Sequence, residues 1–342
     1  MALRPFLVLL TVCSCVLAYY LPRPASPVQC LQFLAGAECL CGDVDWEFQV
    51  FCSCRPVKTL DLRNLSQDYR VSKAAAFHLN DCGKTSVLVF PRAFSQLNLK
   101  SVTFYNISSL TLEPYSIHLN PEVKDAFNIT FSLITTLSIR KDAVNVQLHH
   151  PHAGMNLKIR HASLISLMKS AIVGKLRELT MEEMLVKARP WPGAVVCQGL
   201  TGASVIMKSV LIKKGLSSRW ITGNISSLSI SKSSLRLLPD AFAGVNIEAG
   251  SKSKTRIVLL GNNFMIPSLP SHALPSHGYL SQAKQNYIVC QCQNLAWLLE
   301  SPSTQVKQSV KASLICRNNK SISSVLASCE KPCTVKDCKQ NP

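Results

Sequence analysis

The chain has 342 residues, of which 47% are hydrophobic and 16% are charged. This composition supplies enough apolar side chains for a continuous core and excludes general disorder. The formal net charge is +18, so we expect a basic surface that favours anionic partners.

Residues 1–18 have the pattern of a secretory signal peptide. Arg4 gives a positive start, the run from Phe6 to Leu17 is apolar, and Ala18 offers a small residue for cleavage. An uncleaved anchor is the alternative, but the run is short for a bilayer span. Because no later segment is long and apolar enough to be a transmembrane segment, and the polar C-terminus lacks a hydrophobic anchor tail, we predict a secreted, extracellular protein.

Cysteines cluster near both ends of the remaining chain. The clusters are Cys30, Cys39, Cys41, Cys52, Cys54 and Cys82, and then Cys290, Cys292, Cys316, Cys329, Cys333 and Cys338. In an oxidising compartment such clusters predict disulfides. Zinc is less favoured, because Cys-x-Cys is a poor zinc spacing. Cys197 stands alone and leaves an odd total, so we consider it the candidate for a disulfide-linked dimer.

N-glycosylation sequons fit the same compartment. Their asparagines are Asn64, Asn106, Asn128, Asn224 and Asn319.

Short apolar strands recur through the middle of the chain at intervals of 22 to 29 residues. Their last apolar residues are Phe104, Phe131, Ile159, Met181, Met207, Ile230 and Leu259. One such unit cannot bury its apolar face alone, whereas stacked units share a core. An antiparallel sandwich is the alternative, but the intervals are long for hairpins and no Asn-Gly or Asp-Gly turn connects the strands.

The segment Leu228 to Phe242, with its Leu-Pro-x-x-Ala-Phe turn, resembles an extracellular leucine-rich repeat, and Ile257 to Phe264 resembles another. That family places an asparagine three residues beyond the last strand leucine. Here the equivalent positions hold Cys82, Ile107, Ile134, Ala162, Met184, Val210, Ser233 and Asn262. Only Asn262 is standard, so we expect loose, irregular coils in the middle that drift toward a general parallel β-helix.

The resemblance implies a leucine-rich-repeat solenoid. Its concave face would be a curved parallel β-sheet, its convex side irregular loops and few short helices, and both ends disulfide caps. The implied parts are a signal peptide (1–18), an N-terminal cysteine-rich cap (19–58), the solenoid (59–285), a C-terminal cysteine-rich cap (286–329) and a basic cysteine-containing tail (330–342).

The family's caps also imply a disulfide pattern. The implied pairs are Cys30–Cys41, Cys39–Cys52, Cys290–Cys316 and Cys292–Cys329. Among the surplus cysteines, we pair Cys54 with Cys82 and Cys333 with Cys338, with Cys82 as a buried thiol the alternative. A short amphipathic helix carrying Leu295, Trp297, Leu298 and Leu299 would cover the last coil.

No residue pattern indicates catalysis. The sequence has no hydrolase nucleophile elbow, phosphate-binding glycine loop or His-Glu-x-x-His zinc motif. The three histidines His149, His150 and His152 are the best metal candidate, but a surface loop is the favoured interpretation. A polysaccharide-cleaving β-helix would need clustered carboxylates on one strand face. We therefore expect no enzyme activity, no cofactor and no metal.

We predict that the residues alternating with the core line the concave sheet and form the binding face. They include Thr103, Tyr105, Thr130, Ser132, Lys158, Arg160, Thr180, Glu182, Ile206, Lys208, Ser229, Ser231, Val258 and Leu260. Similar proteins, such as Slit-type and Toll-type ectodomains, act as ligands, receptors or adhesion modules. The resemblance therefore implies binding of an extracellular protein or receptor.

The alternative is a matrix protein held by acidic glycosaminoglycan. Basic clusters support this interpretation at Lys208, Lys213, Lys214 and Arg219, at Lys252, Lys254 and Arg256, and at Lys331, Lys336 and Lys339. In a secreted protein these charges favour acidic glycans, anionic lipids or acidic proteins over nucleic acid. General solubility explains them equally well.

Overall fold

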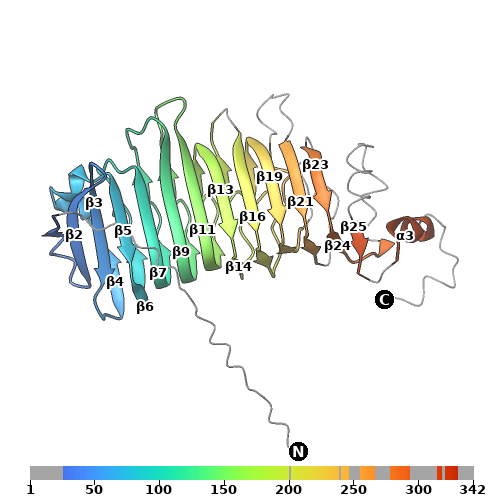
Figure 1. The fold of residues 1–342 in the computed structure, drawn as a ribbon, viewed down its shortest axis with the longest axis horizontal. Helices are drawn as coiled ribbons and strands as arrows, with labels where there is room; N and C mark the ends of the chain where they lie inside the picture. The colour runs from blue at the N-terminus through green and yellow to red at the C-terminus, as the bar shows by residue number, and fades with distance from the viewer. Residues whose placement is uncertain are drawn as a thin grey trace, which may run out of the picture.

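The computed structural model describes residues 26–199, 202–238, 240–245, 255–265, 278–292, 314–317 and 320–329. These residues form a parallel β-solenoid with few helices, whose coils stack side by side from the N-terminal to the C-terminal end (Figure 1). Within this part of the chain, no helix is long and apolar enough to cross a membrane.

The first side of the solenoid is a long parallel ladder, which we call the long sheet. Its strands are β3 (Glu47–Cys54), β5 (Ala76–Asn80), β7 (Ser101–Leu112), β9 (Ala126–Ile139), β11 (Gly154–Leu167), β13 (Leu176–Glu182), β16 (Ala203–Lys208), β19 (Ile225–Ser231), β21 (Thr255–Leu260) and β23 (Gly278–Lys284). The predicted alternation is confirmed, because the inward residues from Phe104 to Leu259 are at most 3% exposed.

The second side continues from the first after a corner. It is built from the second halves of β7, β9 and β11 together with β4 (Thr59–Leu62), β6 (Cys82–Val89), β14 (Leu185–Val186), β17 (Leu211–Ile212), β20 (Ser234–Leu235), β22 (Asn263–Phe264), β24 (Asn286–Ile288) and β25 (Leu314–Cys316). The third side is a separate parallel sheet of β8 (Ile117–Leu119), β10 (Val144–Val146), β12 (Ile172–Gly174), β15 (Val195–Cys197) and β18 (Ile221–Gly223).

The prediction of irregular loops opposite the long sheet is wrong for the central coils, and so is the prediction that these coils are loose, whereas their expected drift toward a general parallel β-helix agrees with the structure. They carry strands on all three sides, and β9 and β11, at 14 residues each, are the longest strands described. The physical reason is the apolar residue at the family's asparagine position. Ile107, Ile134 and Ala162 are buried and pair directly across the ladder, so the backbone bonds continue through the corner.

Each corner turns on one residue in the left-handed conformation. At the first corner this residue is Asn106, Leu133, His161, Glu183, Ser209, Lys232 or Gly261 in successive coils. At the second corner it is Tyr115, Asp142, Ser170, Gly193, Arg219 or Asp240. Most are not glycine, so tertiary pairing overrides the local cost of positive φ. Neighbouring corners are hydrogen bonded, as where the Ser170 N–H donates to the Gly193 carbonyl over 2.7 Å.

The N-terminal end is closed by a hairpin of β2 (Ala37–Val44) and β3, to which β1 (Val28–Cys30) is added antiparallel. The disulfides here are Cys30–Cys41, Cys39–Cys52 and Cys54–Cys82. They are the pairs expected from the sequence, and Cys82 is therefore not a thiol.

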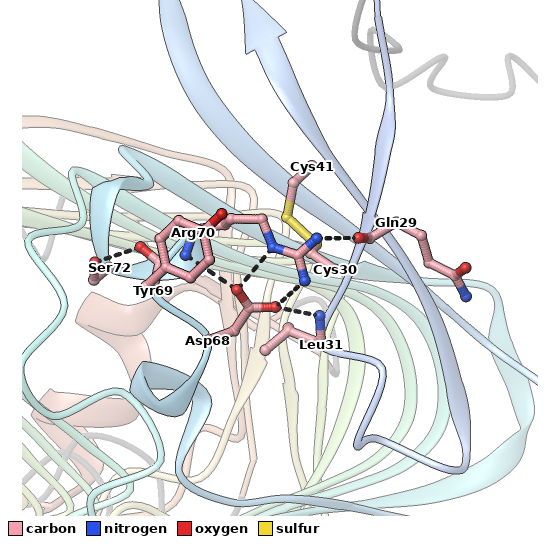
Figure 2. Close-up of polar contacts among 8 residues, drawn as sticks. All are labelled: Gln29, Cys30, Leu31, Cys41, Asp68, Tyr69, Arg70 and Ser72. Carbon is pink, nitrogen blue, oxygen red and sulfur yellow. Dashed lines mark hydrogen bonds and ion pairs between the residues drawn. A yellow bond between two sulfur atoms is a disulfide. The ribbon is translucent and has the colours of Figure 1, made fainter.

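A carboxylate between two short 3₁₀ helices, η1 (Leu65–Gln67) and η2 (Val71–Lys73), fastens β1 to the first coil (Figure 2). Asp68 accepts hydrogen bonds from the Leu31 backbone N–H at 2.8 Å and from two nitrogens of the Arg70 guanidinium at 2.9 and 2.8 Å. Arg70 in turn donates to the Gln29 carbonyl over 2.5 Å. We call Asp68 and Arg70 the cap clamp.

The C-terminal end carries β25 and the helix α3 (Ile322–Cys329). Its disulfides are the expected Cys290–Cys316 and Cys292–Cys329. The expected helix at residues 295–299, the expected pair Cys333–Cys338 and the sequon Asn319 all lie outside the described residues.

Candidate binding face

The outward side chains of the long sheet form two rows that run across the coils. In one row Thr103, Thr130, Lys158 and Thr180 are register partners on successive strands. The second row holds Tyr105, Ser132, Arg160, Glu182 and Lys208 in the same way. The predicted face residues Thr103, Tyr105, Lys158, Arg160 and Lys208 therefore all point outward on one sheet. Strand pairing places successive members of a row about 5 Å apart.

A charged triplet occupies the centre of the second row. The Glu182 carboxylate lies 3.2 Å from the Arg160 guanidinium and 2.5 Å from the Lys208 ammonium group. The hydrogen bond from Lys208, with the positive charges beside it, lowers the pKa of Glu182 and outweighs the opposing effect of burial. The same bond raises the pKa of Lys208. The central face is thus charged but internally paired, and less basic than its sequence suggests.

The C-terminal part of the face is small and hydroxyl-rich. Ser227 donates its hydroxyl to Ser204 over 2.9 Å, while Ser229 and Ser231 continue the two rows. The half-buried Val258 and Leu260 follow on β21. A surface with this pattern offers hydrogen bonds beside shallow apolar contacts, which is typical of protein recognition surfaces.

An unpredicted imidazole stacks at the N-terminal end of the same face. The His78 ring lies 4.8 Å from the Phe51 ring and nearly parallel to it, and its Nε2 lies 3.2 Å from Gln49 Oε1. Burial lowers the pKa of His78 to about 4, so this ring is neutral at physiological pH. The face therefore begins with an aromatic pair rather than a charge.

Three sequon asparagines are exposed near the N-terminal half of the solenoid. Asn128 lies at the start of β9 on the face itself and accepts a hydrogen bond from Asn156 over 3.0 Å. Asn106 lies at the first corner, and Asn64 precedes η1. Asn224 is half-buried at the third corner. A glycan on Asn128 would cover the N-terminal half of the face and leave the serine-rich half open.

No protein-family model, curated protein or solved structure matches this chain. Its function is therefore argued from the arrangement of its own residues.

The histidine loop and Cys197 contribute little to the face. Across the described ranges, no group of three or more histidine, cysteine or acidic residues could hold a metal ion. The His150 and His152 rings lie 5.8 Å apart in a loop next to β11.

Cys197 is only 6% exposed at the end of β15. Burial raises its pKa to about 12, so little thiolate forms in the folded protein, and the disulfide-linked dimer expected at this residue stays a prediction.

Two polar sites were missed from the sequence. One is the cap clamp, and the other is Asn286, which extends the asparagine position to the coil after Asn262. The signal for Asn286 was present, because it lies three residues beyond the inward-facing Ala283. The cap clamp has no such signal, since Leu31, the partner of Asp68, and Gln29, the partner of Arg70, lie far from it in the sequence.

Proposed function

We propose that this chain is a secreted, disulfide-capped binding protein that engages an extracellular protein or receptor through the outer face of its long sheet. The observation that carries the proposal is the double row of outward, mostly polar side chains across parallel strands, in which Ile206 is the apolar member before Ser229 and Val258 and Leu260 follow. Part of this surface loses little conformational entropy when a partner docks, since Glu182 already pairs with Arg160 and Lys208, and Ser227 with Ser204. The five disulfides among the described residues support an oxidising, extracellular setting.

We also propose that the leucine-rich-repeat relation holds for the C-terminal coils. Asn262 is fully buried and donates to the Ile230 carbonyl over 2.8 Å, and its Oδ1 accepts the Ser233 N–H over 3.1 Å. Asn286 donates likewise to the Leu259 carbonyl over 3.0 Å. These bonds support a family-type asparagine ladder. The central coils with three strands per turn carry apolar residues instead, so the proposed relation weakens there.

The proposal is for binding rather than catalysis. A polysaccharide-cleaving β-helix would place free carboxylates together on one strand face. On the outer face of the central coils the carboxylates are Glu178 and Glu182. The first accepts a hydrogen bond from Thr180 over 2.6 Å, and the second is held by two cations. Measurable polysaccharide cleavage by the pure protein would contradict this part of the proposal.

Partner capture from extracellular material tests the proposal. A photo-crosslinking residue would be placed at Ser229 on the face or, as a control, at Asn145 on the third side. Both positions are half-buried and point outward. We expect the functional partner to be captured from Ser229 and not from Asn145.

Purified partner would then be titrated against matched variants. Thr103→Arg with Ser229→Arg places two bulky charges on the face and leaves every sequon intact, whereas Ser109→Arg with Thr111→Arg places the same charges on the second side. We expect the face variant to bind about tenfold more weakly or worse, a loss of about 1.4 kcal/mol. A partner that binds both variants equally well would remove the face from consideration.

A further inference from the structure

The positive charge of the central coils is concentrated away from the long sheet. Between Asp142 and Asp240 the sequence has 13 Lys and Arg residues but only three acidic residues, Glu178, Glu182 and Glu183. All three acids lie on β13 or at the corner directly after it. The second and third sides of these coils therefore carry cations with no carboxylate among them. The nearest carboxylates at this corner are Asp142 and Asp240, on the coils directly before and after.

Six exposed cations gather where the second side meets the third. They are Lys169, Lys187, Arg189, Lys213, Lys214 and Arg219, which we call the cationic edge. Lys187 directly follows β14, and Lys213 follows β17 at the equivalent place. Backbone hydrogen bonds confirm this alignment, because the Lys187 N–H donates to the Leu164 carbonyl and the Lys213 N–H donates to the Val186 carbonyl.

The other members are aligned by the second corner. The Ser170 N–H donates to the Gly193 carbonyl, and the Gly193 N–H to the Arg219 carbonyl, each over 2.7 Å. Lys169 and Arg219 thus lie on coils on either side of the Gly193 coil. The cationic edge spans three successive coils, and strand pairing sets its repeat at about 5 Å.

None of these six side chains forms an ion pair or side-chain hydrogen bond with another part of the described chain. This differs from Lys208 on the long sheet, which pairs with Glu182. Like charges at this spacing repel each other, and a polyanion lying along the edge would relieve that repulsion.

An aromatic ring lies on the same edge. Trp191 is 57% exposed, and its backbone N–H donates to the Leu167 carbonyl over 3.0 Å. The preceding Pro190 carbonyl accepts a hydrogen bond from the Ser217 hydroxyl of the next coil, which fixes the loop. An exposed indole offers a flat apolar surface that fits the face of a sugar ring, and a free anion makes no such contact.

We propose that the cationic edge binds a linear sulfated polysaccharide, with anionic groups along the row of cations and one sugar ring on Trp191. This surface is distinct from the outer face of the long sheet, so the proposal goes beyond the proposed function and does not depend on it. It also divides the basic cluster expected from the sequence, because Lys208 faces a different side from Lys213, Lys214 and Arg219.

Heparin binding by the full secreted chain tests the proposal. The edge variant carries Lys187→Ser, Arg189→Ser, Lys213→Ser and Lys214→Ser. The matched control removes three lysines and one arginine from the N-terminal coils, by Lys58→Ser, Lys73→Ser, Lys84→Ser and Arg55→Ser, all at exposed positions. Both variants lose the same net charge, and unchanged thermal unfolding would show that both fold.

We expect the edge variant to bind heparin at least about tenfold more weakly near physiological salt, and the slope of log affinity against log salt to fall by up to about 3. The control should stay close to the wild type. Equal losses in both variants would indicate net charge alone and overturn the proposal, as would a wild type that heparin resin does not retain at low salt.

Two further probes separate the ligand classes. Trp191→Ala should weaken heparin binding without changing the slope of log affinity against log salt. Unchanged affinity would show that the indole does not contact the ligand. Hyaluronan, which carries carboxylates but no sulfates, should bind more weakly than heparin. If phosphatidylcholine vesicles containing phosphatidylserine bind as tightly as heparin and respond equally to the edge variant, the surface is a membrane site and the proposal is wrong.

Discussion

Asn262 and Asn286 occupy the same buried position on neighbouring coils, and their side chains are joined by a 3.0 Å hydrogen bond from Asn262 Nδ2 to Asn286 Oδ1. Each amide also reaches a backbone group of the coil before it. The pair therefore connects three coils through side chains at the C-terminal end, where the paired second-side strands are short.

Asn262→Ala should destabilise these coils strongly. It leaves the buried Ser233 N–H and Ile230 carbonyl without their partner, so we expect the free energy of unfolding to fall by about 2–4 kcal/mol. Urea unfolding measures the change. Asn145→Ala, at a half-buried outward position on β10, is the control and should change the free energy by less than about 0.5 kcal/mol. Similar losses in both variants would contradict the ladder.

The cap clamp should make the N-terminal end sensitive to acid. The Arg70 side-chain hydrogen bond is the main reason why the pKa of Asp68 lies below its ordinary value of 3.8, and it outweighs the opposing effect of burial. Because the pKa of Asp68 is lower in the folded than in the unfolded protein, its charge stabilises the fold at pH values above the unfolded-state pKa. This stabilisation is lost as the pH falls through the folded-state pKa. We therefore expect Asp68→Asn to lower the Tm by about 2–4 °C at neutral pH.

Thermal unfolding at two pH values tests this assignment. As the pH falls below 3.8 and through the lower folded-state pKa of Asp68, the wild-type carboxylate becomes protonated, so the difference in Tm between the wild type and Asp68→Asn should shrink. Asp61→Asn, which removes an exposed ion pair with Arg63, is the control and should change the Tm little at either pH. If the Tm difference between the wild type and Asp68→Asn is the same in acid as at neutral pH, the charge of Asp68 does not contribute to stability.

Lys208 should react slowly with amine-acylating reagents. Its hydrogen bond to Glu182 raises its pKa, which lowers the fraction of neutral, nucleophilic amine at neutral pH. Mass spectrometry should show several-fold less modification at Lys208 than at the exposed Lys213. Glu182→Gln should raise the extent of modification at Lys208 to about that at Lys213, while the modification of Lys213 itself stays unchanged. Fast modification of Lys208 in the wild type would contradict the paired geometry.

Cys197 should be unreactive until the protein unfolds. Its thiol is buried and its pKa is raised to about 12, so little thiolate forms at pH 8. Iodoacetamide should modify it only in urea, and Cys197→Ser should abolish that urea-dependent signal. A dimer on non-reducing gels that disappears in Cys197→Ser would instead support the linkage expected from the sequence.

The sequence predicted the repeat well because burial leaves a direct pattern. Phe104, Phe131 and their equivalents alternate with outward residues, and this alternation predicts which side chains lie on the outer face of the long sheet. The third side was missed because β8, β10 and β12 have only three residues each, too few for a recognisable period. The sequence does not predict the long strands of the central coils, because apolar residues at the asparagine position suggest a loss of backbone hydrogen bonds. In the structure they allow the ladder to continue through the corner.

The face was found in the sequence but its electrostatics were not. Arg160 and Lys208 lie far apart along the chain, and only the register shows that Glu182 sits between them. The same applies to Lys187 and Lys213, whose alignment depends on where two short strands end. Pairing across coils is a long-range relationship, so local sequence patterns do not contain it.

The left-handed corners also set the unit in which this protein can change its length. Ser170, Gly193 and Arg219 each bond to the matching corner of the next coil. An insertion of a few residues within one coil would shift its corner residues away from the matching corners of the neighbouring coils, unless the inserted residues formed a protruding loop. Removing or duplicating one entire turn would keep all matching positions together and leave both disulfide-bonded ends intact. Related chains should therefore differ by whole turns, and the length of the recognition surface should vary in equal steps.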